Sequence, residues 1–140
     1  MRKLAVLSMV LGTAMLLAAG CATTGKGLSD EEQIARRIEE GLAAVKALNF
    51  DAFDGFVSES FDSSAVGDKE DLLDYLENAN SMGFLEDLEV DLSEAVTTVN
   101  GSEAEVAPVY VNGVFGSLTL NYTGVKENGV WYISGVEPGF

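Results

Sequence analysis

Apolar residues recur every three or four positions between Ser29 and Leu48. This spacing places them on one face of a helix. A start signal precedes them, because Ser29 and Glu32 have the spacing of a capping box, in which each side chain bonds the backbone amide of the other. We therefore predict an amphipathic helix whose buried stripe contains Ile34, Ile38, Leu42, Val45 and Leu48.

Two further helices are predicted before the strands begin. Asn49-Phe50-Asp51 interrupts the first pattern, and a short second helix follows, with an aromatic inner face that includes Phe53 and Phe56. An extended segment is expected near Phe61. Gly67-Asp68 then caps a third helix, whose apolar side chains reach to about Met82: Leu72, Leu73, Tyr75, Leu76 and Ala79.

From Leu88 onward the apolar period changes from a helical one to two, which indicates strands. Asn100-Gly101, Asn112-Gly113 and Glu127-Asn128-Gly129 are turn signals between these alternating segments. Together they predict an antiparallel sheet of about four strands. Because the helices precede the strands, the fold class is α+β, in one domain.

The N-terminal segment has the layout of a secretory signal. Arg2 and Lys3 precede an uncharged, mostly apolar run from Leu4 to Ala19 that ends in small residues. That run is short for a membrane span, which takes roughly 20 apolar residues. We predict a signal peptide at residues 1–20; the alternative is an uncleaved membrane anchor.

The end of this segment, Leu17-Ala18-Ala19-Gly20-Cys21, resembles the bacterial lipobox. The resemblance implies that Cys21 carries a diacylglycerol, that cleavage occurs before it, and that its amino group receives an acyl chain such as palmitate. Ala18 stands where leucine is usual. Residues 21–27 would then be a lipidated tether, and Ala22 implies the outer membrane of the cell envelope if the host is Gram-negative. The alternative is a cysteine that only ends an ordinary signal.

Charge and composition exclude several kinds of partner and chemistry. The chain has 8 basic and 23 acidic residues, a net charge of −15, so it repels nucleic acid. It contains no histidine, the commonest acid–base group and metal ligand. The segment Asp62 to Leu73 only loosely resembles a calcium loop, because Val66 and Leu73 stand where ligands belong. We expect no metal and no cofactor.

The order of these elements resembles the nuclear transport factor 2-like superfamily, which includes the polyketide-cyclase-like proteins. The resemblance covers about residues 28 to 136 and is carried by Asn49-Phe50-Asp51, Gly67-Asp68-Lys69-Glu70 and the final turn with Trp131 and Ile133. It implies N-terminal helices packed on a curved antiparallel sheet, in a domain over residues 28–140. Members include isomerases, dehydratases, epoxide hydrolases and non-catalytic binders, with the ligand site between sheet and helices.

Strict alternation would place several aromatic residues on the inner face of the sheet, opposite the helices. The resulting hypothesis is a pocket for a small apolar ligand; the alternative is a filled core. Its predicted lining residues are Phe53, Phe56, Tyr75, Tyr110, Tyr122 and Trp131.

This arrangement favours a non-catalytic binding or interaction module. An isomerase or cyclase using a tyrosine and a carboxylate is the second hypothesis. However, Glu89, Asp91 and Glu105 fall on the opposite phase of their strands, so we assign no catalytic residue. Arg36 and Arg37 lie off the apolar stripe of the first helix and are interpreted as solvated charges.

The outer face of the sheet is expected to be nearly free of charge. In so acidic a chain, such a face is where two copies would meet with least repulsion. We therefore expect a homodimer through this face; the alternatives are an ordinary weakly polar surface or a foreign envelope protein as the partner. The residues concerned are Val109, Thr119, Thr123 and Tyr132.

Overall fold

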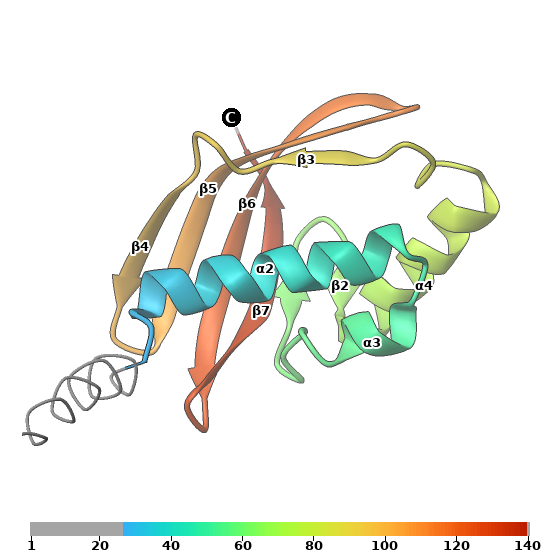
Figure 1. Ribbon diagram of the computed structural model, residues 1–140. Helices are drawn as coiled ribbons and strands as arrows, with labels where there is room; N and C mark the ends of the chain where they lie inside the picture. The colour runs from blue at the N-terminus through green and yellow to red at the C-terminus, as the bar shows by residue number, and fades with distance from the viewer. Residues whose placement is uncertain (1–26, 140) are drawn as a thin grey trace, which may run out of the picture.

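Helices precede strands along the chain, and α2 lies across the concave side of a curved antiparallel sheet (Figure 1). The computed structural model describes residues 27–139. The predicted signal peptide, the lipid site at Cys21 and nearly all of the tether lie outside these residues. The elements are α2 (Asp30–Lys46), α3 (Phe50–Asp54), β1 (Asp62–Ser63), β2 (Gly67–Asp68), α4 (Lys69–Ser81), β3 (Glu89–Asp91), β4 (Val96–Asn100), β5 (Glu103–Gly113), β6 (Gly116–Glu127) and β7 (Val130–Pro138). The predicted α+β class is confirmed.

The helices begin where polar side chains satisfy their first amide groups. The Ser29 hydroxyl accepts a hydrogen bond from the Glu32 amide at 3.2 Å, which caps the start of α2 with one of the two bonds of the predicted capping box. Asp68 and Asp71 form a reciprocal capping box at the start of α4. Gly67 precedes this cap at a φ of +109°, and a Cβ there would collide with the Asp71 carboxylate.

The sheet is built around the long β5–β6 hairpin. β6 pairs with β5 on one side and with β7 on the other. The short strands β3 and β4 pair with successive parts of β5, so that both form its other edge. The sheet therefore has five strands where about four were expected.

A β-bulge in β5 reverses the side-chain phase. Val106 pairs with Tyr122 and Val109 pairs with Leu120, so β5 uses one more residue than β6 between these pairs. Val106 points inward before the bulge and Val109 points inward after it; Val109 is 0% exposed. The predicted outward position of Val109 and the predicted inward position of Tyr110 are therefore both wrong, because the alternation is not continuous.

Two hydrophobic clusters hold the layers together. The first lies between α2 and the sheet and contains Ile34, Ile38, Ala104, Val106, Val109, Val111, Tyr122 and Trp131. The second lies where α2, α3 and α4 meet the edge of β7 and contains Val45, Phe53, Val57, Phe61 and Leu72. Backbone hydrogen bonds from Ser58 to Ile133 (2.9 Å) and from Ile133 to Phe56 (2.8 Å) fasten the segment after α3 to β7.

Arg37 connects α2 to the neighbouring elements. Its guanidinium donates to the Trp131 carbonyl at 2.8 Å and to the Gly55 carbonyl at 3.0 Å. It also lies 4.3 Å from the centroid of the Phe56 ring and 5.2 Å from that of Tyr132. The interpretation of Arg37 as a solvated charge is therefore wrong, since its side chain packs over the edge of β7.

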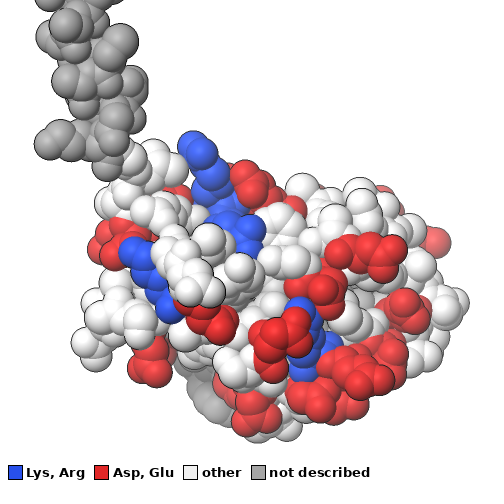
Figure 2. Space-filling model, turned by 90° about the horizontal axis from the view of Figure 1, so that it is seen from below, with Lys and Arg blue, Asp and Glu red and all other residues white. Residues whose placement is uncertain are grey.

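Acidic side chains are spread over the face seen in Figure 2, and the few basic side chains on that face lie beside acidic ones. Lys69, for example, contacts Asp54 at 3.3 Å and Glu59 at 2.8 Å. Lys126 contacts Asp30 at 2.9 Å, and this hydrogen bond, with a second from the Trp131 indole, lowers the pKa of Asp30. The N-terminus of α2 is thereby tied to the β6–β7 hairpin.

Candidate functional site

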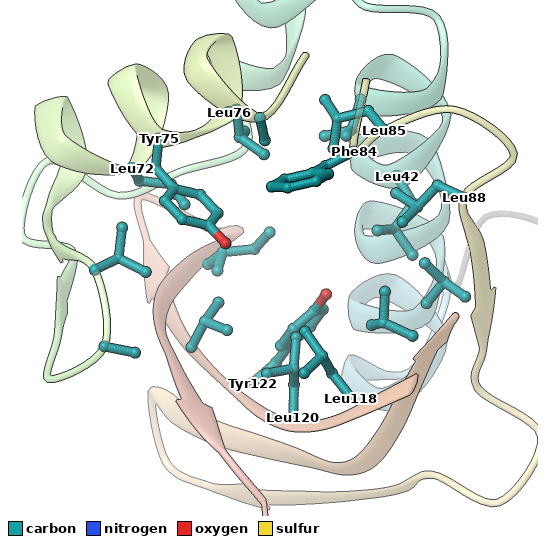
Figure 3. Close-up of a pocket in the computed structure, with 18 of the residues that line it drawn as sticks. Leu42, Leu72, Tyr75, Leu76, Phe84, Leu85, Leu88, Leu118, Leu120 and Tyr122 are labelled. Carbon is teal, nitrogen blue, oxygen red and sulfur yellow. The ribbon is translucent and has the colours of Figure 1, made fainter. Parts of the chain in front are cut away.

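Members of both hydrophobic clusters line a cavity of about 550 Å³ between the helices and the concave face of the sheet. The helices present the C-terminal half of α2 and one face of α4, and the segment after α4 closes one side (Figure 3). The β5–β6 hairpin provides the opposite wall with inward residues such as Val111, Leu118 and Leu120. The curved sheet and the helices thus leave a hollow that side chains do not fill.

Two phenol groups are the main polar features of this cavity. The hydroxyls of Tyr75, on α4, and Tyr122, on β6, both point into it from different walls (Figure 3). Tyr122 is buried, and burial raises its pKa to about 12, so its hydroxyl stays protonated at neutral pH. A protonated phenol can both donate and accept a hydrogen bond. Tyr75 is 57% exposed and therefore stands at the mouth.

Three of the six predicted pocket residues line the cavity: Phe53, Tyr75 and Tyr122. Phe56 is not among its lining residues, because its ring packs against Gly41 and beneath the Arg37 guanidinium. The short helix α3 therefore presents Phe53 to the cavity and Phe56 to the edge of β7.

Trp131 and Tyr110 also lie away from the cavity. Trp131 is 2% exposed and its indole donates to Asp30 at 3.0 Å, so it belongs to the core beneath the start of α2. The bulge turns Tyr110 to the outer face, where the nearby charge of Glu94 raises its pKa. Neither residue therefore joins Tyr75 and Tyr122 on the cavity wall, although Trp131 shares the first hydrophobic cluster with Tyr122.

The pattern of the sequence did not reveal two parts of the cavity wall. One is the segment with Phe84, Leu85 and Leu88 after α4, and the other is Phe115 at the tip of the β5–β6 hairpin. Both contain large apolar residues beside turn glycines, where polar residues are the rule. That departure is the signal that could have identified them.

Among the residues 27–139, those that line the cavity include no Asp, Glu, Lys or Arg. Nor do the described residues contain a group of three or more acidic, histidine or cysteine side chains placed to hold a metal ion. In the same part of the chain, no helix is long and apolar enough to cross a bilayer. The described lining is thus mostly apolar, and its hydroxyl-bearing residues are Tyr75, Tyr122 and Thr119.

The outer face of the sheet differs in detail from the expectation. Val109 is buried in the core and cannot contribute to a contact there. Thr123 accepts a hydrogen bond from Ser134 at 3.2 Å, Tyr132 lies against Arg37, and Thr119 borders the cavity. Dimerisation through this face stays a prediction, and Thr119, Thr123 and Tyr132 are the residues that would carry it.

Comparison with known proteins shows the fold. The chain resembles a cystatin-like protein of unknown function from Nostoc punctiforme PCC 73102 (TM-score 0.64, 16% identity, covering 78% of this chain and 89% of that one). It has the cystatin-like, nuclear transport factor 2-like fold. An NTF-2 like protein of unknown function from Shewanella oneidensis MR-1 aligns with a TM-score of 0.62 at 13% identity, over 78% of this chain and 98% of that one.

The same fold occurs in a scytalone dehydratase-like protein from Novosphingobium aromaticivorans DSM 12444 (TM-score 0.62, 17% identity, 77% of this chain and 81% of that one). No family model and no curated protein sequence matches the chain. The nuclear transport factor 2-like fold that the sequence predicted is confirmed, and it hosts different activities, so function has to be argued from the site.

Proposed function

We propose that this protein is a lipid-anchored lipoprotein of the cell envelope whose domain binds a small apolar ligand without transforming it. One observation carries the proposal: an apolar cavity of about 550 Å³ into which two phenol groups and no described carboxylate project. Pockets for small molecules commonly have volumes of about 300–1,000 Å³, with mostly apolar walls and a few convergent polar groups. This cavity has both properties.

The walls define the chemistry of the ligand. A charged group would lose its hydration without gaining a partner, because the described lining residues carry no charge at neutral pH. A neutral, largely hydrocarbon molecule would instead bury its apolar surface favourably. A hydroxyl or carbonyl group on such a ligand could bond with Tyr122 in the interior or with Tyr75 at the mouth.

The isomerase or cyclase hypothesis is less well supported. General acid–base catalysis needs a group whose pKa lies near the working pH. The buried phenol of Tyr122 has a pKa of about 12, which makes it a poor acid and a poor source of phenolate at neutral pH. A carboxylate that would act with it is missing among the described lining residues.

The anchoring half of the proposal rests on Cys21, the single cysteine of the chain. Diacylglycerol with a further acyl chain on the same residue would hold the protein firmly, whereas one chain holds only marginally. The domain begins within a few residues of this cysteine, so it would stay close to the membrane surface.

The binding proposal is tested by titrating the protein with Nile red, a neutral apolar dye that fluoresces in apolar surroundings. We expect saturable binding that Leu120→Trp weakens by about tenfold or more, because the larger side chain would occupy the cavity. The matched control is Val130→Trp, an exposed position outside the cavity, which should leave the affinity unchanged. Equal binding by the two folded variants, or no saturable binding by the parent, would contradict the proposal.

A further inference from the structure

The mouth of the cavity is surrounded by exposed apolar side chains. Six of the ten large hydrophobic residues that are exposed in the described chain lie on α4, just after it, or at the tip of the β5–β6 hairpin. Four of them also line the cavity, and we call these the apolar rim: Tyr75, Phe84, Phe115 and Leu118. Met82 and Val114 flank the rim residues in sequence and are 62% and 59% exposed. Apolar surface gathered in this way indicates a contact with something other than water.

The two segments that carry Phe84, Phe115 and Leu118 contain no charged residue, whereas Tyr75 lies on α4 next to Asp74 and near Glu77. Asn78 to Leu85 contains no charged residue, and neither does Val106 to Val125, although the chain has 23 acidic residues. Elsewhere the acidic surface opposes approach to an anionic membrane. At Phe84, Phe115 and Leu118 the mouth therefore opposes a bilayer less than the acidic surface around it does.

We propose that the apolar rim docks on the lipid bilayer and that the cavity loads its ligand directly from that bilayer. The inference rests on the proposed binding function, because a neutral, largely hydrocarbon ligand partitions into membranes rather than water. Aromatic and aliphatic side chains such as Phe84 and Phe115 are suited to the membrane interface. A mouth that touches the bilayer lets such a ligand enter without crossing water.

The reach of the tether is compatible with this contact. Fully extended, residues 21–27 span at most about 25 Å. The helix α2 has 17 residues and is about 25 Å long; it begins next to the tether, and its C-terminal half lines the cavity. A lipid on Cys21 and the rim can therefore reach the same bilayer together. Anchoring makes this contact effectively intramolecular, which favours the bilayer over a second copy of the chain as the occupant.

Depth-dependent quenching tests the docking. The lipidated protein, made with its own signal, is reconstituted into phosphatidylcholine vesicles with brominated acyl chains. Phe115→Trp adds an indole at the rim, and Val96→Trp adds one at an exposed position on β4 as the control; the buried Trp131 is common to both. We expect the added fluorescence to be lost for Phe115→Trp and kept for Val96→Trp. Equal quenching of the two overturns the proposal. Emission from Phe115→Trp that is blue-shifted but not quenched also overturns it, because this result would indicate that a second copy of the chain covers the rim.

Ligand loading is tested with flanking residues that do not line the cavity. The double variant Met82→Asp, Val114→Asp should slow transfer of Nile red from vesicles by about tenfold or more, because it replaces two apolar contacts with charges. Its affinity for dye in water should stay unchanged. Transfer as fast as in the control Val96→Asp overturns the proposal. Two outcomes separate the docking proposal from the binding proposal. If dye binds in the cavity but the fluorescence of Phe115→Trp is not quenched, docking fails and the binding function stands. If that fluorescence is quenched but Leu120→Trp binds dye as well as the parent, the binding function fails, and ligand loading fails with it.

Discussion

Substituting Val109 by Ala tests the β-bulge on which the inner face of the sheet depends. The side chain of Val109 is fully buried between the sheet and α2, and alanine removes two methyl groups from it. Each lost methyl group, with the space it leaves, costs on the order of 1 kcal/mol, so Val109→Ala should lower the free energy of unfolding by about 2 kcal/mol. In a domain of this size, that corresponds to a fall in Tm of roughly 8 °C.

The matched control is Tyr110→Ala, the next residue along the same strand. Although tyrosine is much larger, its side chain lies on the outer face and is partly exposed, so the loss should stay below about 1 kcal/mol. Urea unfolding followed by far-ultraviolet circular dichroism measures both free energies. A larger loss for Tyr110→Ala than for Val109→Ala would mean that β5 alternates without a bulge, and the description of the inner face would then be wrong.

Three further predictions follow from buried groups and from the N-terminal motif. Trp131→Ala should lower the free energy of unfolding by about 3–5 kcal/mol, measured by urea unfolding, because the indole is 2% exposed; an unchanged midpoint would contradict this burial. Since the folded pKa of Tyr122 is about 12 and a free tyrosine titrates near 10, the unfolded chain loses this proton first, so stability should fall between about pH 10 and 12. Urea midpoints across that range should fall less steeply for Tyr122→Phe. Cys21→Ser should abolish partition into detergent and the added mass of a diacylglyceryl group. If the Ser variant is equally membrane-bound, the N-terminal segment is an uncleaved membrane anchor and the lipidation prediction is wrong.

The features that could be predicted from the sequence are those set by neighbouring residues. The caps of α2 and α4 and the turns at Asn100-Gly101 and Asn128-Gly129 depend on side chains only a few positions apart, so local patterns locate them well. The turn predicted at Asn112-Gly113 is wrong by two residues, because both residues pair with β6 and the chain turns at positions 114–115. The pattern predicts Phe53, Tyr75 and Tyr122 on the cavity wall correctly, because each follows the periodicity of its own element without interruption.

The features that escaped prediction depend on single irregularities or on distant packing. One additional residue in β5 reverses the facing of every later residue in that strand, and Pro108, which has no amide hydrogen for the ladder, is the only local sign of it. Arg37 lies off the apolar stripe of α2, yet β7 supplies an acceptor for its guanidinium. An apolar inner face predicts burial, but whether it encloses a core or a cavity depends on how far the helices stand from the sheet.

The hollow interior has a consequence for how the domain responds to hydrostatic pressure. Unfolding removes internal voids, so the unfolded chain and its solvent occupy less volume, and pressure favours that state in proportion to the void lost. Water that enters the cavity of about 550 Å³ through its mouth would find few hydrogen-bond partners on the apolar walls, so the inner part of this space counts toward the void. The domain should therefore unfold at a lower pressure than a solidly packed domain of equal Tm. A bound ligand, or the Leu120→Trp side chain in its place, should raise that pressure.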